Sequence, residues 1–309
     1  MRFGGKASQK IANYLPKNSM SLVPLLQTAR IRGDWRRRRR VEVLHETIHC
    51  FNQNATGLQQ TAGNNLARWA REPTQQADID CRVVVMQGDM LDAAGQLTRA
   101  YGTQFACLNM ANATFPGGGY TTGCSAQEEN MARRTQLHTV FDESQVVKRG
   151  REIVYNDEMH ELVSGKSGRV YVSPTPLVCI RGREEYDDTT SLGYAFLPSD
   201  LIFPFLELRS AAVDRSRKRK ASYARDLSEM EKRVEAQFAT LISTGVRHVV
   251  LSAFGCGAFK NDPNDIARVY KEAVERHRAS FVVIAFAIFY AGHGQDNYKI
   301  FKTHLAPED

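Results

Sequence analysis

The sequence predicts an α/β fold in which a mostly parallel or mixed sheet is flanked by helices. From about residue 80 onward, short apolar runs rich in Val, Ile and Phe alternate with amphipathic segments. The chain has 309 residues, 42% hydrophobic and 24% charged, which is typical of a globular protein. It contains no apolar run of about 18 residues, so no membrane-spanning segment is predicted.

A helical N-terminal extension is expected before this alternating part. Apolar residues recur there at helix spacing, at Val41, Leu44, Ile48 and Phe51. This spacing predicts a helix over residues 35–52, and the polar, Gln-rich stretch 54–78 is expected to be a connector. We therefore expect residues 1–79 to form an extension packed on the core, and residues 80–309 to form the main domain.

Within residues 80–309 the predicted elements alternate. Runs of β-branched and aromatic residues predict strands at 82–86, 104–108, 152–155, 177–180, 247–252 and 281–289. Amphipathic segments predict helices at 91–100, 126–138, 223–243 and 263–278. The last helix begins with Asp262 and Pro263, a favoured cap and first-turn pair. Because ligands bind at the carboxyl ends of strands in such sheets, we expect the chemistry in the loops that follow strands.

Glycine-rich loops follow two of the predicted strands. The first, 109–120, contains three consecutive glycines, and the second, 253–263, contains two glycines separated by a cysteine. Glycines let a backbone approach a ligand closely and turn its N–H groups toward an anion. A single glycine run is more often a turn than a binding site, but two such loops favour a diphosphate held from both sides. Neither loop has the pattern of a P-loop or of a Rossmann dinucleotide site.

Two adjacent glutamates follow the first glycine loop. Seven residues separate its last glycine from Gln127, Glu128 and Glu129, which begin the next predicted helix. The helix dipole favours an acid at this position, and this alone explains one glutamate. Two adjacent carboxylates cannot share one helix face, so at least one is expected to point toward the loop. A neighbouring carboxylate and a partly desolvated pocket would raise a glutamate pKa toward the working pH of a general acid.

In combination, these motifs resemble the signature of poly(ADP-ribose) glycohydrolases, particularly the microbial type, which implies a macrodomain-like fold. The matching blocks are Gly88–Met90, Asn109–Asn112, Gly117–Gly119 with Gln127–Glu129, and Gly255–Phe259. Further similarity is found at 36–52, Ser173–Pro176 and Asn297–Phe301. The blocks are scattered over roughly residues 35–305, so the resemblance covers most of the chain.

The resemblance implies a role for each matching residue. Glu129 is expected to be catalytic, and Glu128 to bind the hydroxyls of the distal ribose together with Asn112. Asp89 is expected to bind the adenine amino group. The other residues expected to bind the ligand, mainly around the diphosphate, are Gly117, Gly118, Gly119, Gln127, Gly255, Cys256, Gly257, Ala258 and Phe259.

Other positions leave alternatives open. Phe289 and Tyr290 follow the last predicted strand and are equally compatible with stacking on adenine and with closing the core. Thr175 stands where the family usually has an acidic residue, and Asp214 stands where an asparagine is common. These departures concern the leaving side of the substrate, not the ADP-ribose side.

Neither a metal nor a cofactor is expected. The six cysteines form no C-x-x-C pair, which disfavours a zinc site and a disulfide framework and is typical of a reducing compartment. We therefore expect a cytoplasmic or nuclear protein without a secretion signal. The net charge of +7 is concentrated in residues 36–40 and 215–220. These runs are compatible with nuclear targeting, with contact to a polyanion, or with a solvated surface.

The predicted function is an ADP-ribosyl glycohydrolase that acts on poly(ADP-ribose) or on an ADP-ribosylated protein, with a glutamate as general acid and base. One alternative is a hydrolase specific for mono-ADP-ribosyl arginine, or another side chain, on a protein. Another is a non-catalytic ADP-ribose reader, which would not need both Glu128 and Glu129. Nucleic-acid binding rests only on the basic runs and leaves both glycine loops unexplained, so it is disfavoured. No membrane partner is expected.

Overall fold

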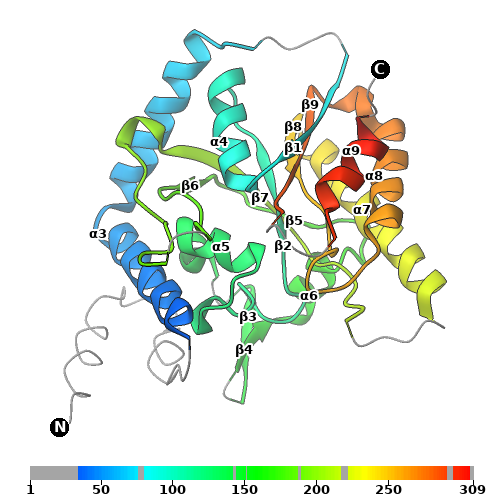
Figure 1. Cartoon of the computed structure of the whole chain (residues 1–309), viewed down its shortest axis with the longest axis horizontal. Coiled ribbons are helices and arrows are strands. Elements are labelled where there is room, and N and C mark those ends of the chain that lie inside the picture. Colours follow the sequence, from blue (N-terminus) through cyan, green and yellow to red (C-terminus); the bar gives the residue numbers. More distant parts are fainter. Residues whose placement is uncertain are drawn as a thin grey trace.

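A mixed seven-stranded sheet forms the centre of the protein (Figure 1). The computed structural model describes residues 34–75, 80–141, 144–150, 152–186, 189–216, 222–290 and 295–306. In spatial order its strands are β1 (Arg82–Gln87), β9 (Val283–Ile288), β8 (His248–Leu251), β2 (Ala106–Met110), β7 (Phe203–Ser210) and β5 (Tyr171–Val172). A further strand, β6 (Leu177–Cys179), also pairs with β7. The pairs from β1 to β7 are parallel, whereas β5 and β6 run antiparallel to β7.

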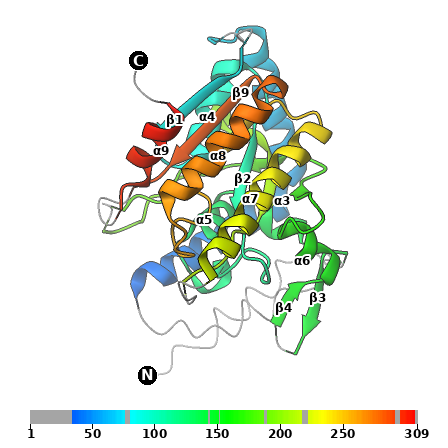
Figure 2. The same ribbon diagram turned by 90° about the vertical axis from the view of Figure 1, so that its right-hand side faces the viewer.

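Helices cover both faces of this sheet, which confirms the predicted fold class. One face carries α3 (Trp35–Arg71), α4 (Met90–Tyr101) and α5 (Gln127–Arg134). The other carries α7 (Tyr223–Ser243), α8 (Pro263–His277) and α9 (Asn297–Leu305), which lie side by side in Figure 2. Every residue of β9 is buried, as expected for a strand covered on both faces.

Smaller elements surround one end of the sheet. The strands β3 (Val146–Arg149) and β4 (Glu152–Tyr155) form an antiparallel hairpin that projects from the body, and α6 (Asp157–Val163) follows it. Short 3₁₀ turns lie at Tyr120–Thr122, Gln136–Val140, Ser199–Leu201 and Arg278–Ser280.

Side-chain caps fix the starts of two helices that follow strands. The Asp89 carboxylate accepts hydrogen bonds from the backbone N–H groups of Leu91 and Asp92 at the start of α4. Asp262 caps α8 in the same way, and Pro263 occupies its first turn as predicted. Both caps therefore fix the direction in which the chain leaves the sheet.

The N-terminal part differs from the predicted helix and connector. α3 continues to Arg71, with non-helical backbone angles at Asn54, so the expected connector is wrong over residues 54–71. The sequence of this half did not predict a helix, because the helix makes few buried contacts there and some of them are polar. Asn65, for example, is buried and donates to the carbonyls of Ser199 and Ile202. The helix packs on α4, α5 and β7, whereas the boundary at residues 79 and 80 stays a prediction.

One further expectation is corrected, and one strand was missed. The helix expected over 126–138 ends at Arg134, because Thr135 adopts an extended backbone and bridges to Cys179. The central strand β7 was not predicted, because Glu207 and Arg209 interrupt its apolar pattern. Both charges are fully buried and pair with each other, with Nη2 of Arg209 2.8 Å from Oε2 of Glu207.

Candidate active site

The chain segments that the glycine motifs occupy meet at one edge of the sheet. β1, β9, β8 and β2 are consecutive parallel strands of the sheet, so their carboxyl ends lie along the same side. The first glycine loop follows β2 and the second follows β8. The expected location of the chemistry is therefore the place where the two loops meet.

The first glycine loop binds the two glutamates of α5 through its backbone. Both carboxylate oxygens of Glu128 accept hydrogen bonds, from the Asn112 N–H at 2.8 Å and from the Gly117 N–H at 3.1 Å. Oε1 of Glu129 accepts from the Gly119 N–H at 2.8 Å. Both glutamates are buried, with 3% and 7% of their surface exposed. Both carboxylates thus turn back toward the loop, where the sequence predicted at least one.

Gly118 lies between these carboxylates and has no room for a side chain. Its φ of +58° belongs to the left-handed region that favours glycine. A Cβ atom there would lie 2.6 Å from Oε1 of Glu129 and 3.0 Å from Oε2 of Glu128. The glycine is therefore required by the close approach of the acids.

The two carboxylates differ in their environment. Burial and the adjacent negative charge of Glu129 raise the pKa of Glu128 well above its usual range. Glu129 uses only one oxygen for the loop, and its Oε2 is buried with no hydrogen-bond partner among the described residues. A buried carboxylate oxygen is costly to leave unsatisfied, so this atom is available to a further donor such as water or a ligand.

Two other predicted residues hold the loop in shape. Oε1 of Gln127 accepts from the Met110 N–H at 2.9 Å, and its Nε2 donates to the Leu108 carbonyl at 3.1 Å. Gln127 therefore ties the start of α5 to the end of β2. Oδ1 of Asn112 accepts from two backbone N–H groups of the loop itself, 2.8 Å away in each case. The side-chain oxygen of Asn112 is thus engaged within the protein, and its expected ribose contact stays a prediction.

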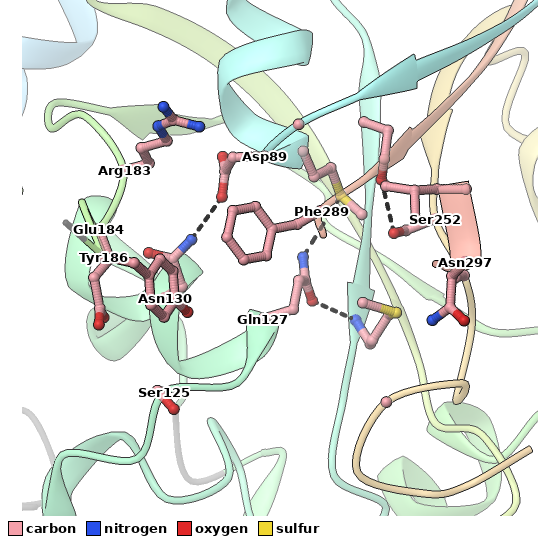
Figure 3. A pocket seen from close by; sticks show the side chains of 17 residues that line it. Asp89, Ser125, Gln127, Asn130, Arg183, Glu184, Tyr186, Ser252, Phe289 and Asn297 are labelled. Atoms are coloured by element: carbon pink, nitrogen blue, oxygen red, sulfur yellow. Dashed lines mark hydrogen bonds between the residues drawn. The ribbon is translucent and has the colours of Figure 1, made fainter. Parts of the chain in front are cut away.

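A cavity of about 180 Å³ lies beside the glutamates, at the ends of β1 and β9 (Figure 3). Of the residues that the sequence singled out, Asp89, Gln127, Gly257 and Phe289 line this cavity. The three glycines of the first loop and the two glutamates do not line it, so the cavity adjoins the acids without containing them.

Asp89 is held firmly at one end of this cavity. Its carboxylate pairs with the buried Arg134 and accepts from Nδ2 of Asn130 at 2.8 Å. Burial works against ionisation, but the Arg134 guanidinium keeps the Asp89 pKa below its usual value. Asp89 is therefore an anionic acceptor at the cavity wall, in keeping with the expected contact to an amino group.

The second glycine loop has a different hydrogen-bond pattern. Gly255 has φ +73°, and a Cβ atom there would lie 2.5 Å from Cβ of Ala212. Nδ2 of Asn261 donates to the Gly255 carbonyl at 3.1 Å and fixes the base of the loop. Along the tip, the backbone N–H groups of residues 257–259 donate to no acceptor within the described part of the chain. They are free to bind an anion, and the expected contact with a diphosphate stays a prediction.

The sequence did not predict that residues 181–186 contribute to the cavity wall. Arg183, Glu184 and Tyr186 from this segment line the cavity, and Figure 3 places them opposite Asp89 and Phe289. The rings of Tyr186 and Phe289 stack with centroids 5.1 Å apart, and both remain partly exposed. Phe289 therefore lies at the cavity mouth and not in the core, which resolves one alternative left open by the sequence. No local pattern distinguished Tyr186 from any other exposed tyrosine.

Two properties of the described residues bear on cofactors and membranes. No three His, Cys, Asp or Glu side chains among them are grouped so as to hold a metal ion. None of the helices in the described ranges is both long and apolar enough to cross a membrane.

Comparisons with known proteins agree with the resemblance expected from the motifs. Residues 30–159 match the family model of the microbial-type PARG catalytic domain, where PARG denotes poly(ADP-ribose) glycohydrolase. This segment includes the first glycine loop and both glutamates. No curated protein matches the chain. The predicted resemblance to this hydrolase family is confirmed.

Solved structures with a similar fold are bacterial poly(ADP-ribose) glycohydrolases. The enzyme from Thermomonospora curvata is 22% identical with a TM-score of 0.60, over 87% of this chain and 100% of that chain. A Deinococcus radiodurans enzyme in complex with ADP-ribose is 23% identical with a TM-score of 0.55, over 81% of this chain and 91% of that chain. At this level of identity the comparison establishes the macrodomain-like fold.

Proposed function

Starting from the match of residues 30–159 to the microbial-type PARG catalytic domain, we propose that this chain is an ADP-ribosyl glycohydrolase. It releases ADP-ribose from poly(ADP-ribose) or from an ADP-ribosylated protein. Glu129 is the general acid and base of this reaction. The solved relative from Deinococcus radiodurans, which has the same fold, is in complex with ADP-ribose.

The observation that carries the proposal is the free oxygen of Glu129. One carboxylate oxygen is fixed by the Gly119 N–H, while Oε2 is buried and has no partner in the part of the chain that the structure describes. A carboxyl group held in this way is oriented before the substrate binds. This lowers the free-energy cost of positioning it next to the reacting bond. A protein that only binds ADP-ribose has no need for a second buried acid beside Glu128.

The chemistry follows from the bond that must break. Cleavage at the anomeric carbon of the distal ribose passes through an oxocarbenium-like transition state. The protonated Glu129 carboxyl donates its proton to the leaving atom as the glycosidic bond breaks. The resulting carboxylate stabilises the positive charge and then takes a proton from the attacking water. Glu129 ends the cycle protonated, so no metal is needed in this scheme.

Glu128 supports this step from the neighbouring position. Its raised pKa favours the neutral carboxyl, which limits charge repulsion when Glu129 is ionised. The loop N–H groups hold this carboxyl in a fixed orientation, which supports its assignment to the ribose hydroxyls. We assign the positioning of the ribose to Glu128 and Asn112.

The remaining parts of the ligand are assigned to the second loop and the cavity. The open N–H groups of residues 257–259 are suited to the diphosphate, whose charge they would stabilise without a metal. Asp89 and Phe289 line the cavity and suit an adenine, through its amino group and its ring. Cys256, Ala258 and Phe259 contribute to the same diphosphate loop.

The proposal is tested by incubating the purified wild type and the Glu129→Ala variant with poly(ADP-ribose) and with mono-ADP-ribosylated proteins. Release of free ADP-ribose is followed by chromatography. We expect release by the wild type and a loss of about 100-fold or more in the variant, the scale of a lost general acid. The substrate consumed distinguishes a chain-degrading enzyme from a mono-ADP-ribosyl hydrolase. Binding of ADP-ribose without release from either substrate would make the protein a reader.

A further inference from the structure

A buried ion pair joins the N-terminal helix α3 to the segment 181–186. Nε and Nη2 of Arg40 donate to the two carboxylate oxygens of Glu184, at 2.9 and 2.7 Å. Both side chains are buried, with 9% and 3% of their surface exposed. This bidentate geometry fixes the relative orientation of the two side chains as well as their distance. Arg40 is thus no part of a solvated basic face, although it ends the run of five arginines.

Tyr194 and Arg133 extend this pair to the helix that carries the glutamates. The Tyr194 hydroxyl donates to Oε2 of Glu184 at 2.8 Å and accepts from Nε of Arg133, also at 2.8 Å. Arg133 lies on α5, one turn after Glu129. Tyr194 has φ +58°, which is strained for an aromatic residue and persists only where the surrounding contacts enforce it.

The two arginines also hold the loop between the glycines and the glutamates. Nη1 of Arg40 donates to the Gly123 carbonyl at 3.3 Å, and Nη1 of Arg133 donates to the Cys124 carbonyl at 2.8 Å. The backbone of α3 touches this loop directly, because a Cβ atom at Gly123 would lie 2.3 Å from the Arg37 carbonyl oxygen. Gly123 and Cys124 therefore have polar anchors outside the loop.

The other end of this network is the cavity wall. Glu184 itself lines the cavity, and Arg183 and Tyr186 flank it in the same segment. The network thus touches the cavity wall, the loop that precedes the glutamates, and the helix that bears them. Removing two charges from water is costly, and apolar residues of the same size often stabilise a protein equally well. Stability alone does not account for the arrangement.

We propose that Arg40 and Tyr194 are positioning residues that couple the cavity wall at residues 183–186 to the loop at residues 120–124, and through it to Glu128 and Glu129. This inference rests on the proposed function, since it assigns a role in that reaction to residues that do not touch the substrate. When the wall is displaced, the loop carbonyls lose their anchors and the carboxylates lose their alignment. A displacement of about 1 Å at a reacting group can lower a rate about 100-fold, so such coupling affects turnover.

The experiment combines Tyr194→Phe with Arg40→Lys, and uses Arg37→Lys as the matched control. Tyr194→Phe removes only the hydroxyl, and Arg40→Lys keeps the positive charge but cannot form the two hydrogen bonds of the guanidinium with Glu184. Arg37 lies on the same helix with its side chain exposed, so its replacement leaves the network intact. Hydrogen exchange is followed at Thr122, Gly123 and Cys124, whose N–H groups are hydrogen-bonded within the loop.

In both variants of the network we expect faster hydrogen exchange at these loop amides. We also expect kcat to fall about tenfold, which is less than the loss caused by full misplacement of a reacting group. The double variant should be no slower than the more affected single variant, because the two residues act as one unit. Tyr194→Phe should retain its fold, so failure of Arg40→Lys to fold would not remove the test. Exchange changes confined to residues 181–186 and 189–196, or wild-type kcat in Tyr194→Phe, would overturn the coupling. The exchange readout needs no substrate, so it also distinguishes failure of the coupling from failure of the proposed activity.

Discussion

The two glycine loops have similar sequences of small residues but opposite uses of their backbone. In the first loop, the N–H groups of Gly117 and Gly119 donate to glutamate carboxylates, and that of Gly118 donates to the Phe115 carbonyl. In the second loop, the N–H groups of residues 257–259 have no acceptor among the described residues. The first loop therefore holds acids, whereas the second is open to an anion.

This difference shows that a glycine run alone does not define an anion site. The N–H groups of Gly117 and Gly119 are saturated by the protein's own carboxylates, which compete with a phosphate for the same donors. Close contact of this loop with the diphosphate stays a prediction, and its main role in our account is to orient Glu128 and Glu129. The following substitutions test whether the first loop orients the acids and the second loop binds the anion.

The largest effect is expected from Gly118→Ala in the first loop. The new Cβ would meet the Glu129 carboxylate at 2.6 Å, in a backbone conformation that alanine rarely adopts. We expect turnover to fall about 100-fold because the acids are displaced. Affinity for ADP-ribose, measured by calorimetry, should fall less than turnover does, because Glu128 is only one of the residues assigned to the ligand. A variant with normal turnover would show that the loop does not set the position of the acids.

Gly255→Ala should act mainly on binding. Its Cβ would lie 2.5 Å from Cβ of Ala212, at a φ of +73°, so the second loop must shift. We expect ADP-ribose to bind about tenfold more weakly, a change of about 1.4 kcal/mol, with turnover at saturating substrate largely kept. Gly257→Ala is the control for loop integrity, since its Cβ meets nothing within 4 Å and should not change the melting temperature. If Gly255→Ala loses turnover as Gly118→Ala does, the two loops do not have separate roles in catalysis and in binding.

A smaller effect concerns stability and pH at Glu128. Its folded-state pKa is raised, so the folded protein binds this proton more tightly than the unfolded chain does. The resulting stabilisation is complete below the ordinary glutamate value of 4.5 and is lost as the pH rises through the folded value. Relative to Glu128→Gln, the wild type should lose up to about 1.4 kcal/mol per pH unit in that window. Urea titrations of both proteins measure this difference, and parallel pH profiles would contradict the raised pKa.

Local sequence patterns predicted the parts of the fold that depend on neighbours in the chain. The predicted helix over 223–243 is α7, and the strands before both glycine loops were found within two residues of their observed starts. Such elements are defined by apolar periodicity and by caps such as Asp262, which act over a few residues. The motif residues could be placed at one sheet edge because parallel strands align their ends.

Contacts between distant segments could not be predicted in this way. Arg40 and Glu184 are 144 positions apart, and the sequence around Arg40 is that of a solvated basic helix. The strand β7 was missed because its buried charges satisfy each other, which no local pattern reveals. Of the second basic run, residues 217–220 lie outside the described residues, as does the segment 1–33. Their expected roles stay predictions.

Glu129→Gln provides the most direct test of the central claim, because it keeps the shape of the side chain and removes the acid. Turnover and the dissociation constant for ADP-ribose are measured on the same preparations of wild type and variant. Our account predicts that turnover falls about 100-fold or more, while the variant binds ADP-ribose with nearly the affinity of the wild type. Retained turnover would contradict the role of Glu129 as general acid and base.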